Sequence, residues 1–349
     1  MGFDLVTFGE CMVRLAAPDR MRLEQARHLE VTAAGAEWNV AVNVARLGHR
    51  TAWASRLVDN WVGRFIAGEA RTHGVDTSQV VWTEFDGIGK VRNGLYFLEH
   101  GAGPRASNVV YDRAYSAISG MSFDMVDWKS LLSQTRWLHG TGITPALSET
   151  VAETTVKVFR MAAEMGVTTS YDLNFRSKLW PSKRAIEVNS QIAPYISVMI
   201  GNEEDFEKAL GVKAAGIDQN YAKLDPASYE PVAVEVKKKF PNIQWIGTTL
   251  RDAKTGLLND WRVILYDGTR LYTSKAYENL EIVDRLGGGD SFASAVIASF
   301  LEGRQDGQEI AEFAGAYSAL AHTFPGDMNW ATREEAAKAA KGASARVSR

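Results

Sequence analysis

The segment best suited to chemistry lies late in the chain, where residues 284–290 read DRLGGGD. Three consecutive glycines, Gly287, Gly288 and Gly289, carry no side chains, so several backbone N–H groups can turn toward one point. The apolar spacing that follows predicts a helix, whose N-terminus adds unpaired amides and partial positive charge. Such an arrangement suits a transferring phosphoryl group.

Asp290 stands at the start of the predicted helix, where the dipole favours a carboxylate by about 0.3–1 kcal/mol. A carboxylate there can also accept a proton from a substrate hydroxyl. Glycines that hold phosphate, beside an acid that acts as a base, are two of the parts that phosphoryl transfer requires. The alternative is a flexible glycine loop followed by an aspartate that only caps the helix.

The elements around this segment alternate regularly. Apolar, β-branched runs predict strands at 5–8, 51–58, 136–139, 167–173, 197–200 and 244–249. Amphipathic spacing between them predicts helices at 36–47, 62–70, 149–165, 183–194 and 203–210. Repeated strand–helix–strand units predict an α/β fold with a central, mostly parallel sheet and helices on both faces.

One region interrupts the alternation. Residues 88–116 have the pattern of successive strands with a glycine-rich turn between them. Together with residues 11–33 they predict a small antiparallel sheet that projects from the main domain as a lid. The alternative is an edge hairpin of the main sheet. The last segment, 342–349, is expected to fray.

The pattern Asp-x-x-Gly-x-Gly-Asp before a helix, late in a chain of this length, resembles the signature of the ribokinase-like (PfkB) carbohydrate kinases. The resemblance extends over roughly residues 3–335 and implies a single ribokinase-like domain over 1–341. It implies that Asp290 is the catalytic base and that the amides of 287–290 form an anion hole. It also implies ATP and Mg²⁺, and leaves the need for a monovalent cation open.

An early turn, AGAEWNVA at 34–41, resembles the sugar-binding Gly-Gly-x-x-x-Asn turn of the same family. Small residues let the backbone approach a ligand, and Asn39 offers both donors and acceptors. Ala34 stands where many relatives have glycine. The resemblance implies sugar contacts from Gly35, Ala36, Glu37 and Asn39. The alternative is an ordinary helix N-terminus with a buried asparagine.

Further stretches resemble the members of this family that phosphorylate 2-keto-3-deoxygluconate. By that resemblance the remaining substrate contacts come from Tyr96, Tyr111, Arg113, Arg176 and Asp327. The chemistry agrees, because a guanidinium binds the carboxylate of a sugar acid bidentately, and a neutral hexose needs no such pair of arginines. The alternative for each arginine is a surface salt bridge.

The nucleotide contacts also follow from the resemblance. They are expected from Asn174, Asn202, Thr248, Thr249, Leu250, Arg251, Gly287 and Gly289. Residues 248–252 are expected to end a strand, where hydroxyls and an arginine suit a triphosphate. Asp205 is expected to reach Mg²⁺ through a water molecule, because Mg²⁺ often keeps several waters. The alternatives are an exposed loop and an acidic helix cap.

Composition narrows the partners. The chain has 349 residues, a formal net charge of −3 and one cysteine. The charge provides no global basic field for nucleic acid or acidic lipid, and the single cysteine excludes an intrachain disulfide. Since the N-terminus lacks a basic segment and no long apolar run occurs, we expect a soluble cytoplasmic protein with no membrane contact. The family resemblance implies a homodimer formed through the lid.

The function expected from these observations is transfer of the γ-phosphate of ATP to the terminal C6 hydroxyl of 2-keto-3-deoxygluconate. Other substrates within the family, 2-keto-3-deoxygalactonate, fructose or ribose, and a sugar-binding relative without activity, are the alternatives. A P-loop kinase is disfavoured because no G-x-x-x-x-G-K-[ST] occurs. A dinucleotide-binding enzyme is disfavoured because no G-x-G-x-x-G follows the first strand.

Overall fold

The computed structural model describes residues 2–213, 226 and 229–342. Its main feature is a 10-stranded sheet with the order β13-β12-β11-β10-β9-β8-β1-β4-β5, in which β14 also pairs with β12. The strands of this sheet are β1 (Phe3–Phe8), β4 (Thr51–Asp59), β5 (Val80–Glu84), β8 (Thr135–Thr141), β9 (Thr168–Asp172), β10 (Val198–Ile200), β11 (Trp245–Ala253), β12 (Leu258–Tyr266), β13 (Leu271–Thr273) and β14 (Tyr277–Glu281). The predicted strands are confirmed in type and place.

The strands from β5 to β11 pair in parallel, and only the edge formed by β12, β13 and β14 is antiparallel. Parallel strands need crossover connections, which here are helices. The helices are α1 (Ala36–Arg46), α2 (Trp61–Thr72), α3 (Trp128–Leu132), α4 (Glu149–Glu164), α5 (Ser182–Ile192), α6 (Glu203–Leu210), α7 (Glu230–Lys239), α8 (Gly288–Leu301), α9 (Gly307–Ala321) and α10 (Arg333–Ala340).

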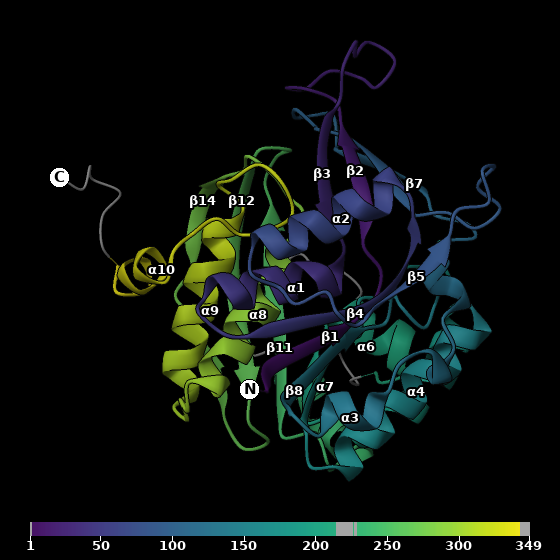
Figure 1. Cartoon of the computed structure of the whole chain (residues 1–349). Coiled ribbons are helices and arrows are strands. Elements are labelled where there is room, and N and C mark those ends of the chain that lie inside the picture. Colours follow the sequence, from purple (N-terminus) through teal and green to yellow (C-terminus); the bar gives the residue numbers. More distant parts are fainter. Residues whose placement is uncertain (1, 214–225, 227–228, 343–349) are drawn as a thin grey trace.

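The helices cover both faces of the large sheet (Figure 1). One buried cluster contains apolar side chains of α3 to α7, and another contains those of α1, α8 and α9. Phe292, Val296 and Ile297 of α8 have no exposed surface. Because α8 is buried almost all round, its first turn is held firmly against the sheet, which fixes the position of the glycine segment.

A separate four-stranded sheet, here called the small sheet, has the order β3-β2-β6-β7. It projects from the main body (Figure 1) and consists of β2 (Met12–Ala16), β3 (Glu30–Ala34), β6 (Leu95–Glu99) and β7 (Asn108–Asp112). The edge-hairpin alternative is therefore wrong. The expected antiparallel arrangement is only partly right, since β2 and β6 pair in parallel. β2 and β6 come from segments far apart in the sequence, so no hairpin joins them.

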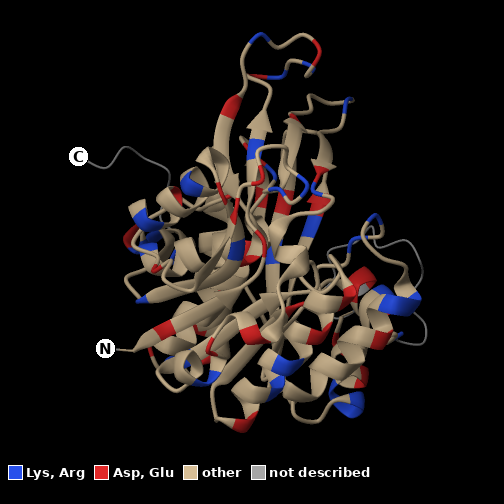
Figure 2. Cartoon of the chain, turned by 45° about the vertical axis from the view of Figure 1, so that its right-hand side comes forward, with Lys and Arg blue, Asp and Glu red and all other residues tan. Residues whose placement is uncertain are grey.

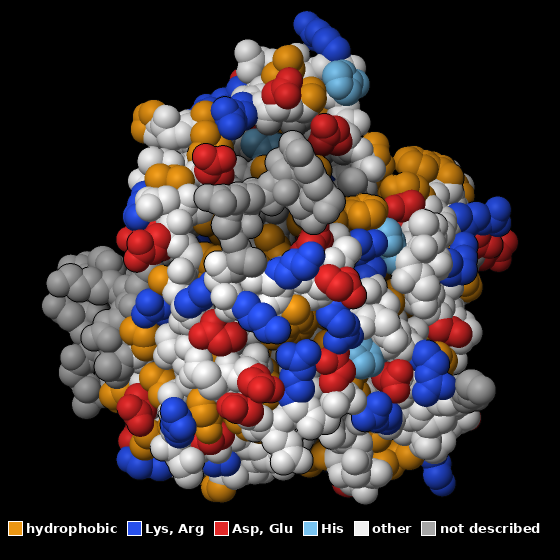
Figure 3. Space-filling model, turned by 90° about the vertical axis from the view of Figure 1, so that its left-hand side faces the viewer, with side chains coloured by type: hydrophobic (Ala, Val, Ile, Leu, Met, Phe, Trp, Pro, Cys, Tyr) orange, Lys and Arg blue, Asp and Glu red, His pale blue; other side chains and the backbone are white. Residues whose placement is uncertain are grey.

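Charged residues gather where the small sheet joins the main body (Figure 2). On the face that includes α9 and α10, basic and acidic side chains are interspersed (Figure 3). Within the described residues, none of the helices has the length and apolar character needed to cross a bilayer. The segment expected to fray lies outside the described residues, apart from Gly342.

Candidate active site

A cavity of about 300 Å³ lies between the small sheet and the carboxyl ends of the parallel strands. This is the edge at which open α/β sheets bind ligands. It brings together almost all the residues that the sequence predicted, although they come from distant parts of the chain. They are Gly35, Ala36, Glu37, Asn39, Tyr96, Tyr111, Arg113, Asn174, Arg176, Asn202, Asp205, Thr249, Arg251, Gly287, Gly288, Gly289, Asp290 and Asp327.

The N-terminus of α8 opens into this cavity. The first hydrogen bond of the helix runs from the Ser291 amide to the Gly287 carbonyl (2.8 Å), so the amides of 288–290 lie outside the helical ladder. No side chain caps the helix at Gly287, whose φ of 77° lies in the left-handed region. The flexible-loop alternative is therefore wrong, because the glycines form an ordered helix start that presents amides to an anion.

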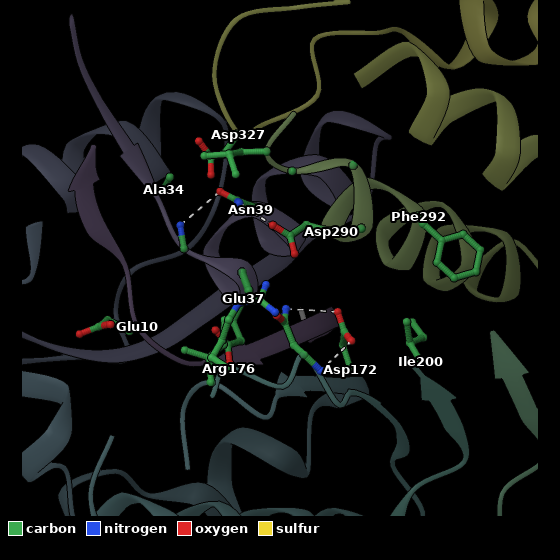
Figure 4. A pocket seen from close by; sticks show the side chains of 18 of the residues that line it. Glu10, Ala34, Glu37, Asn39, Asp172, Arg176, Ile200, Asp290, Phe292 and Asp327 are labelled. Atoms are coloured by element: carbon green, nitrogen blue, oxygen red, sulfur yellow. Dashed lines mark hydrogen bonds between the residues drawn. The ribbon is translucent and has the colours of Figure 1, made fainter. Parts of the chain in front are cut away.

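Asp290 lies in the first turn of α8, with its carboxyl group directed toward Asn39 (Figure 4). The Asn39 amide donates a hydrogen bond of 2.6 Å to Asp290 Oδ2. Burial raises the pKa of Asp290 to about 7, against the opposing effect of the Asn39 bond. A carboxyl group with such a pKa exchanges a proton readily near neutral pH, as a general base must.

Two arginines on the other side of the glycine segment carry positive charge without a carboxylate partner. Neither Arg251 nor Arg285 forms an ion pair with any described residue. Arg285 donates instead to the Gly256 carbonyl (3.0 Å) and to Asn259 (3.2 Å). Burial first, and then the charge of Arg251, lower the pKa of Arg285. Two neighbouring cations that repel each other favour a bound polyanion. Arg285 lies within the DRLGGGD motif, and no role was predicted for it.

Arg113 is paired already, which the sequence analysis missed. Its Nε donates to Glu10 Oε2 (2.8 Å), and its Nη2 contacts the same oxygen. Both side chains are largely buried, with 10% and 3% exposed. Glu10 Oε1 is buried without a partner among the described residues. The signal was present in the sequence, because Glu10 is an acid directly after a buried strand.

Arg176 lies at the mouth of the cavity and is exposed. Its Nη1 donates to the neighbouring Phe175 carbonyl (2.9 Å), and it forms no ion pair within the described part of the chain. Its charge counteracts the raised pKa of Asp290. Arg113 therefore forms a salt bridge that is largely buried and not the surface contact of the alternative, and Arg176 forms no ion pair among the described residues.

Asp327 receives two hydrogen bonds from the small sheet. Arg14 Nη1 (2.6 Å) and the Tyr96 hydroxyl (2.8 Å) both donate to Asp327 Oδ1. Burial raises the pKa of Asp327, and Arg14 opposes the change. Arg14 is an arginine inside an apolar strand, a signal that the sequence analysis did not use.

Asn202 and Asp205 form a capping box at the start of α6. Asn202 Oδ1 accepts from the Asp205 amide, and Asp205 Oδ2 accepts from the Asn202 amide, each at 2.9 Å. Asp205 Oδ1 accepts from the Phe175 amide (2.9 Å). The helix-cap alternative is confirmed, and both residues still line the cavity. Nearby, Asn174 has a φ of 39° and a buried Oδ1 without a partner among the described residues.

Two of the residues expected to contact the nucleotide, Thr248 and Leu250, do not line the cavity. Strand β11 continues to Ala253, so residues 248–252 lie within it and do not end it. Side chains alternate between the faces of a strand, and only Thr249 and Arg251 line the cavity. Thr248 is 1% exposed, and Leu250 packs in the core among apolar side chains.

Glu37 lies in the first turn of α1 and has no exposed surface. Its Oε1 accepts from the hydroxyls of Thr141 (2.8 Å) and Thr144 (2.7 Å). Burial raises the pKa of Glu37 to about 7, against these bonds. Its contacts tie α1 to the end of β8 at the cavity that Glu37 itself lines.

Fold and site together define a phosphoryl-transfer enzyme of the α/β class. An open helix N-terminus, guanidinium groups without an ion-pair partner among the described residues and a half-buried carboxyl group with a pKa of about 7 line one cavity. Positive charge and amides can stabilise a transferring phosphoryl group, and a carboxylate can accept the proton of the acceptor.

Comparisons with known proteins agree. Residues 3–238 match the pfkB family carbohydrate kinase model. The chain is 34% identical to the 2-dehydro-3-deoxygalactonokinase of Haloferax volcanii over 100% of both chains. It is 30% identical to the 2-dehydro-3-deoxygluconokinase of Bacillus subtilis, over 97% of this chain and 95% of the relative. The crystal structure of the 2-dehydro-3-deoxygluconokinase of Thermotoga maritima superposes with a TM-score of 0.90, at 41% identity, over 97% of this chain and 99% of that chain.

The chain belongs to the pfkB family of carbohydrate kinases, enzymes that transfer a phosphoryl group to an alcohol. The family match ends before residue 284, so the glycine segment lies outside it. The match over the whole chain to the Haloferax relative includes that segment.

Proposed function

We propose that this enzyme transfers the γ-phosphoryl group of ATP to the terminal hydroxyl of a 2-keto-3-deoxy sugar acid. The observation that carries the proposal is the convergence at the start of α8. There, the half-buried carboxyl group of Asp290 lies beside free helix amides, and Arg251 and Arg285, which form no ion pair with described residues, line the same cavity. A site for phosphate and a site for a hydroxyl proton therefore adjoin.

In the proposed mechanism, Asp290 accepts the proton of the substrate hydroxyl while the hydroxyl oxygen forms a bond to the γ-phosphorus. The bond between that phosphorus and the bridging oxygen breaks, and ADP leaves with the electron pair. The Asn39 amide holds the carboxylate in place. The amides of 288–290 and the guanidinium groups of Arg251 and Arg285 stabilise the negative charge on the phosphoryl oxygens.

Mg²⁺ fits this site through the nucleotide. Among residues 2–213, 226 and 229–342, no group of three or more histidine, cysteine, aspartate or glutamate side chains forms a metal site. Phosphate oxygens would supply most ligands, with Asp205 reaching the ion through a water. Bound there, Mg²⁺ neutralises charge on the phosphates. We place the reaction in the cytoplasm, where ATP is abundant.

Activity is expected to fall as the pH drops below about 7, because the base must be deprotonated and burial raises the pKa of Asp290 to about 7. The measurement is kcat/KM for the sugar acid from pH 5.5 to 9, at saturating ATP. Glu37 also has a pKa of about 7, so the profile of Glu37→Gln serves as the control. An inflection that disappears in this variant would assign the titration to Glu37 and contradict the role of Asp290.

The substrate class follows from charge and from the relatives. Arg176 offers an unpaired guanidinium at the cavity mouth, which suits a carboxylate. Relatives named for 2-dehydro-3-deoxygluconate and 2-dehydro-3-deoxygalactonate support both epimers. We favour the gluconate, and the galactonate is the second candidate because the Haloferax relative bears its name.

The decisive experiment measures ADP release with a panel of both epimers, gluconate, fructose and ribose. The proposal expects kcat/KM to be highest for the two 2-keto-3-deoxy acids. The ratio of kcat/KM between the two epimers identifies the preferred substrate. Higher kcat/KM for a neutral sugar would contradict the sugar-acid proposal.

Arg113→Ala is expected to raise KM for the sugar acid far more than KM for a neutral sugar. The reason is that the variant removes a cation from the cavity and leaves the Glu10 carboxylate without its partner. The matched control is the double variant Glu10→Gln/Arg113→Met, which removes both charges and isolates the effect of the guanidinium. Equal increases for both substrates in Arg113→Ala would remove the carboxylate argument.

We also propose a homodimer formed through the small sheet. On its outer face Val31, Leu15, Phe97 and Val110 lie side by side across four strands in register. Val31 is 49% and Val110 46% exposed. An apolar row on an exposed sheet favours burial against a second copy. Val110→Lys is expected to halve the mass in light scattering, and an unchanged mass would contradict this interface.

A further inference from the structure

The most deeply buried charged contact of the small sheet belongs to Arg14, on β2. Its side chain is 3% exposed. It binds two carboxylates from the far end of the chain, Asp327 through Nη1 (2.6 Å) and Asp284 through Nη2. A buried guanidinium requires such partners, because loss of one leaves an uncompensated charge in the interior.

Asp284 is the first residue of the glycine-rich motif, and it connects three segments. Its Oδ2 accepts from the Gly326 amide (3.1 Å) as well as from Arg14. Its Oδ1 accepts from the Leu286 amide (3.2 Å), which lies directly before the glycines. The Asp284 carboxylate therefore fixes the entry into α8, and Arg14 fixes that carboxylate.

Asp327 is held from the same side. Its Oδ1 accepts from Arg14 and from Tyr96, which lie on adjacent strands of the small sheet and face each other in register. Asp327 also lines the cavity. Through the Arg14 side chain, the small sheet therefore orients Asp327 at the proposed sugar-acid site and Asp284 at the proposed phosphate site.

From this geometry we propose that Arg14 is a positioning residue that couples the two substrates. Arg14 holds Asp284 and Asp327 in one arrangement, which sugar acid bound beneath the small sheet stabilises, so that the phosphate site at 287–290 is kept in place. Nucleotide bound there holds the small sheet in place over the sugar acid. The proposal rests on the proposed function, and it predicts reciprocal coupling between the two ligands.

The test uses two variants. Arg14→Lys keeps the positive charge but cannot bind both carboxylates at once, as the forked guanidinium does. Arg14→Met removes the positive charge. Affinity for the ATP analogue AMP-PNP with Mg²⁺ is measured by calorimetry with and without saturating 2-keto-3-deoxygluconate. In the wild type we expect the sugar acid to tighten AMP-PNP binding at least about fivefold. In both variants the ratio is expected to approach one, with kcat at least about tenfold lower.

The control is Arg92→Met, which removes another arginine of this region whose partner is Asp112 on the small sheet. It should keep the wild-type coupling. A merely structural role for Arg14 would lower the melting temperature and leave the coupling of the folded protein unchanged. Absence of coupling in the wild type, or wild-type coupling and kcat in both Arg14 variants, would overturn the proposal.

A second measurement covers the case in which Arg14→Met folds poorly. Asp284→Asn keeps an oxygen for the Leu286 amide and removes the charge that Arg14 binds. The losses in kcat from Arg14→Lys and Asp284→Asn should not add in the double variant, and additive losses would contradict the proposal. A wild type that phosphorylates no sugar acid would contradict the proposed function, whereas an active wild type without coupling contradicts only the role of Arg14.

Discussion

Asp290→Asn is expected to lower kcat at least about 100-fold, the usual effect of removing a general base. Asparagine has the size of aspartate and cannot accept the hydroxyl proton at neutral pH. The loss should appear in kcat more than in KM for either substrate, because the proton moves only in the chemical step. The measurement is ADP release at pH 8, where the wild-type carboxylate is deprotonated. Turnover near the wild-type rate would remove Asp290 from the mechanism.

The same variant tests whether the charged Asp290 carboxylate destabilises the folded state. Burial raises the pKa of Asp290 to about 7, so the folded state favours the protonated form. The resulting stabilisation is complete below the pKa of the unfolded chain and is lost as the pH rises through about 7. At pH 8 Asp290→Asn should therefore unfold at a higher temperature than the wild type. The control is Asp59→Asn, a surface aspartate paired with Arg64, which should keep full activity.

Gly287→Ala is expected to lower kcat about 100-fold or more, the effect of losing one donor of an anion hole. A Cβ at this position would lie 1.7 Å from the Asp327 carbonyl oxygen, and the backbone φ is +77°. Either the glycine segment or the 327 loop must move, so the amides of 288–290 no longer converge. The measurement combines kcat with the affinity for AMP-PNP, and both should fall.

Gly303→Ala separates this collision from backbone strain. Gly303 has a φ of +80°, but a Cβ there meets nothing within 4 Å. It follows the C-terminus of α8, at the opposite end of that helix from the cavity. This variant should lose stability and keep its kcat. If Gly303→Ala and Gly287→Ala lose activity equally, strain and not the anion site explains the effect.

Local patterns predicted most of the fold. The helix that begins at Gly288 and the parallel strands follow from periodicity, because each element buries one face or both. The glycine motif predicted an open helix N-terminus with free amides, since its chemistry is contained in consecutive residues. Strand β11 was harder, because its apolar run did not reveal where the strand ends, and alternation then placed Thr248 and Leu250 away from the cavity.

Contacts between distant segments could not be predicted from one sequence. Arg14 and Asp284 are 270 positions apart, and Glu10 and Arg113 are 103 apart. Taken alone, each of these residues is of a charged type that usually lies at the protein surface. Only the pairing of β2 with β6, which turns one face of the small sheet toward the glycine motif, makes Arg14 a buried link.

The parallel pairing of β2 and β6 also constrains the order in which parts of the protein fold during synthesis. The carboxylates that neutralise Arg14 lie 270 and 313 positions after it, so they leave the ribosome long after Arg14. Until then the Arg14 guanidinium, which also contacts His100, lacks both of its carboxylate partners. Contacts of such long range form slowly and late, and the cavity between the small sheet and the main sheet stays unassembled until Asp284 and Asp327 have emerged.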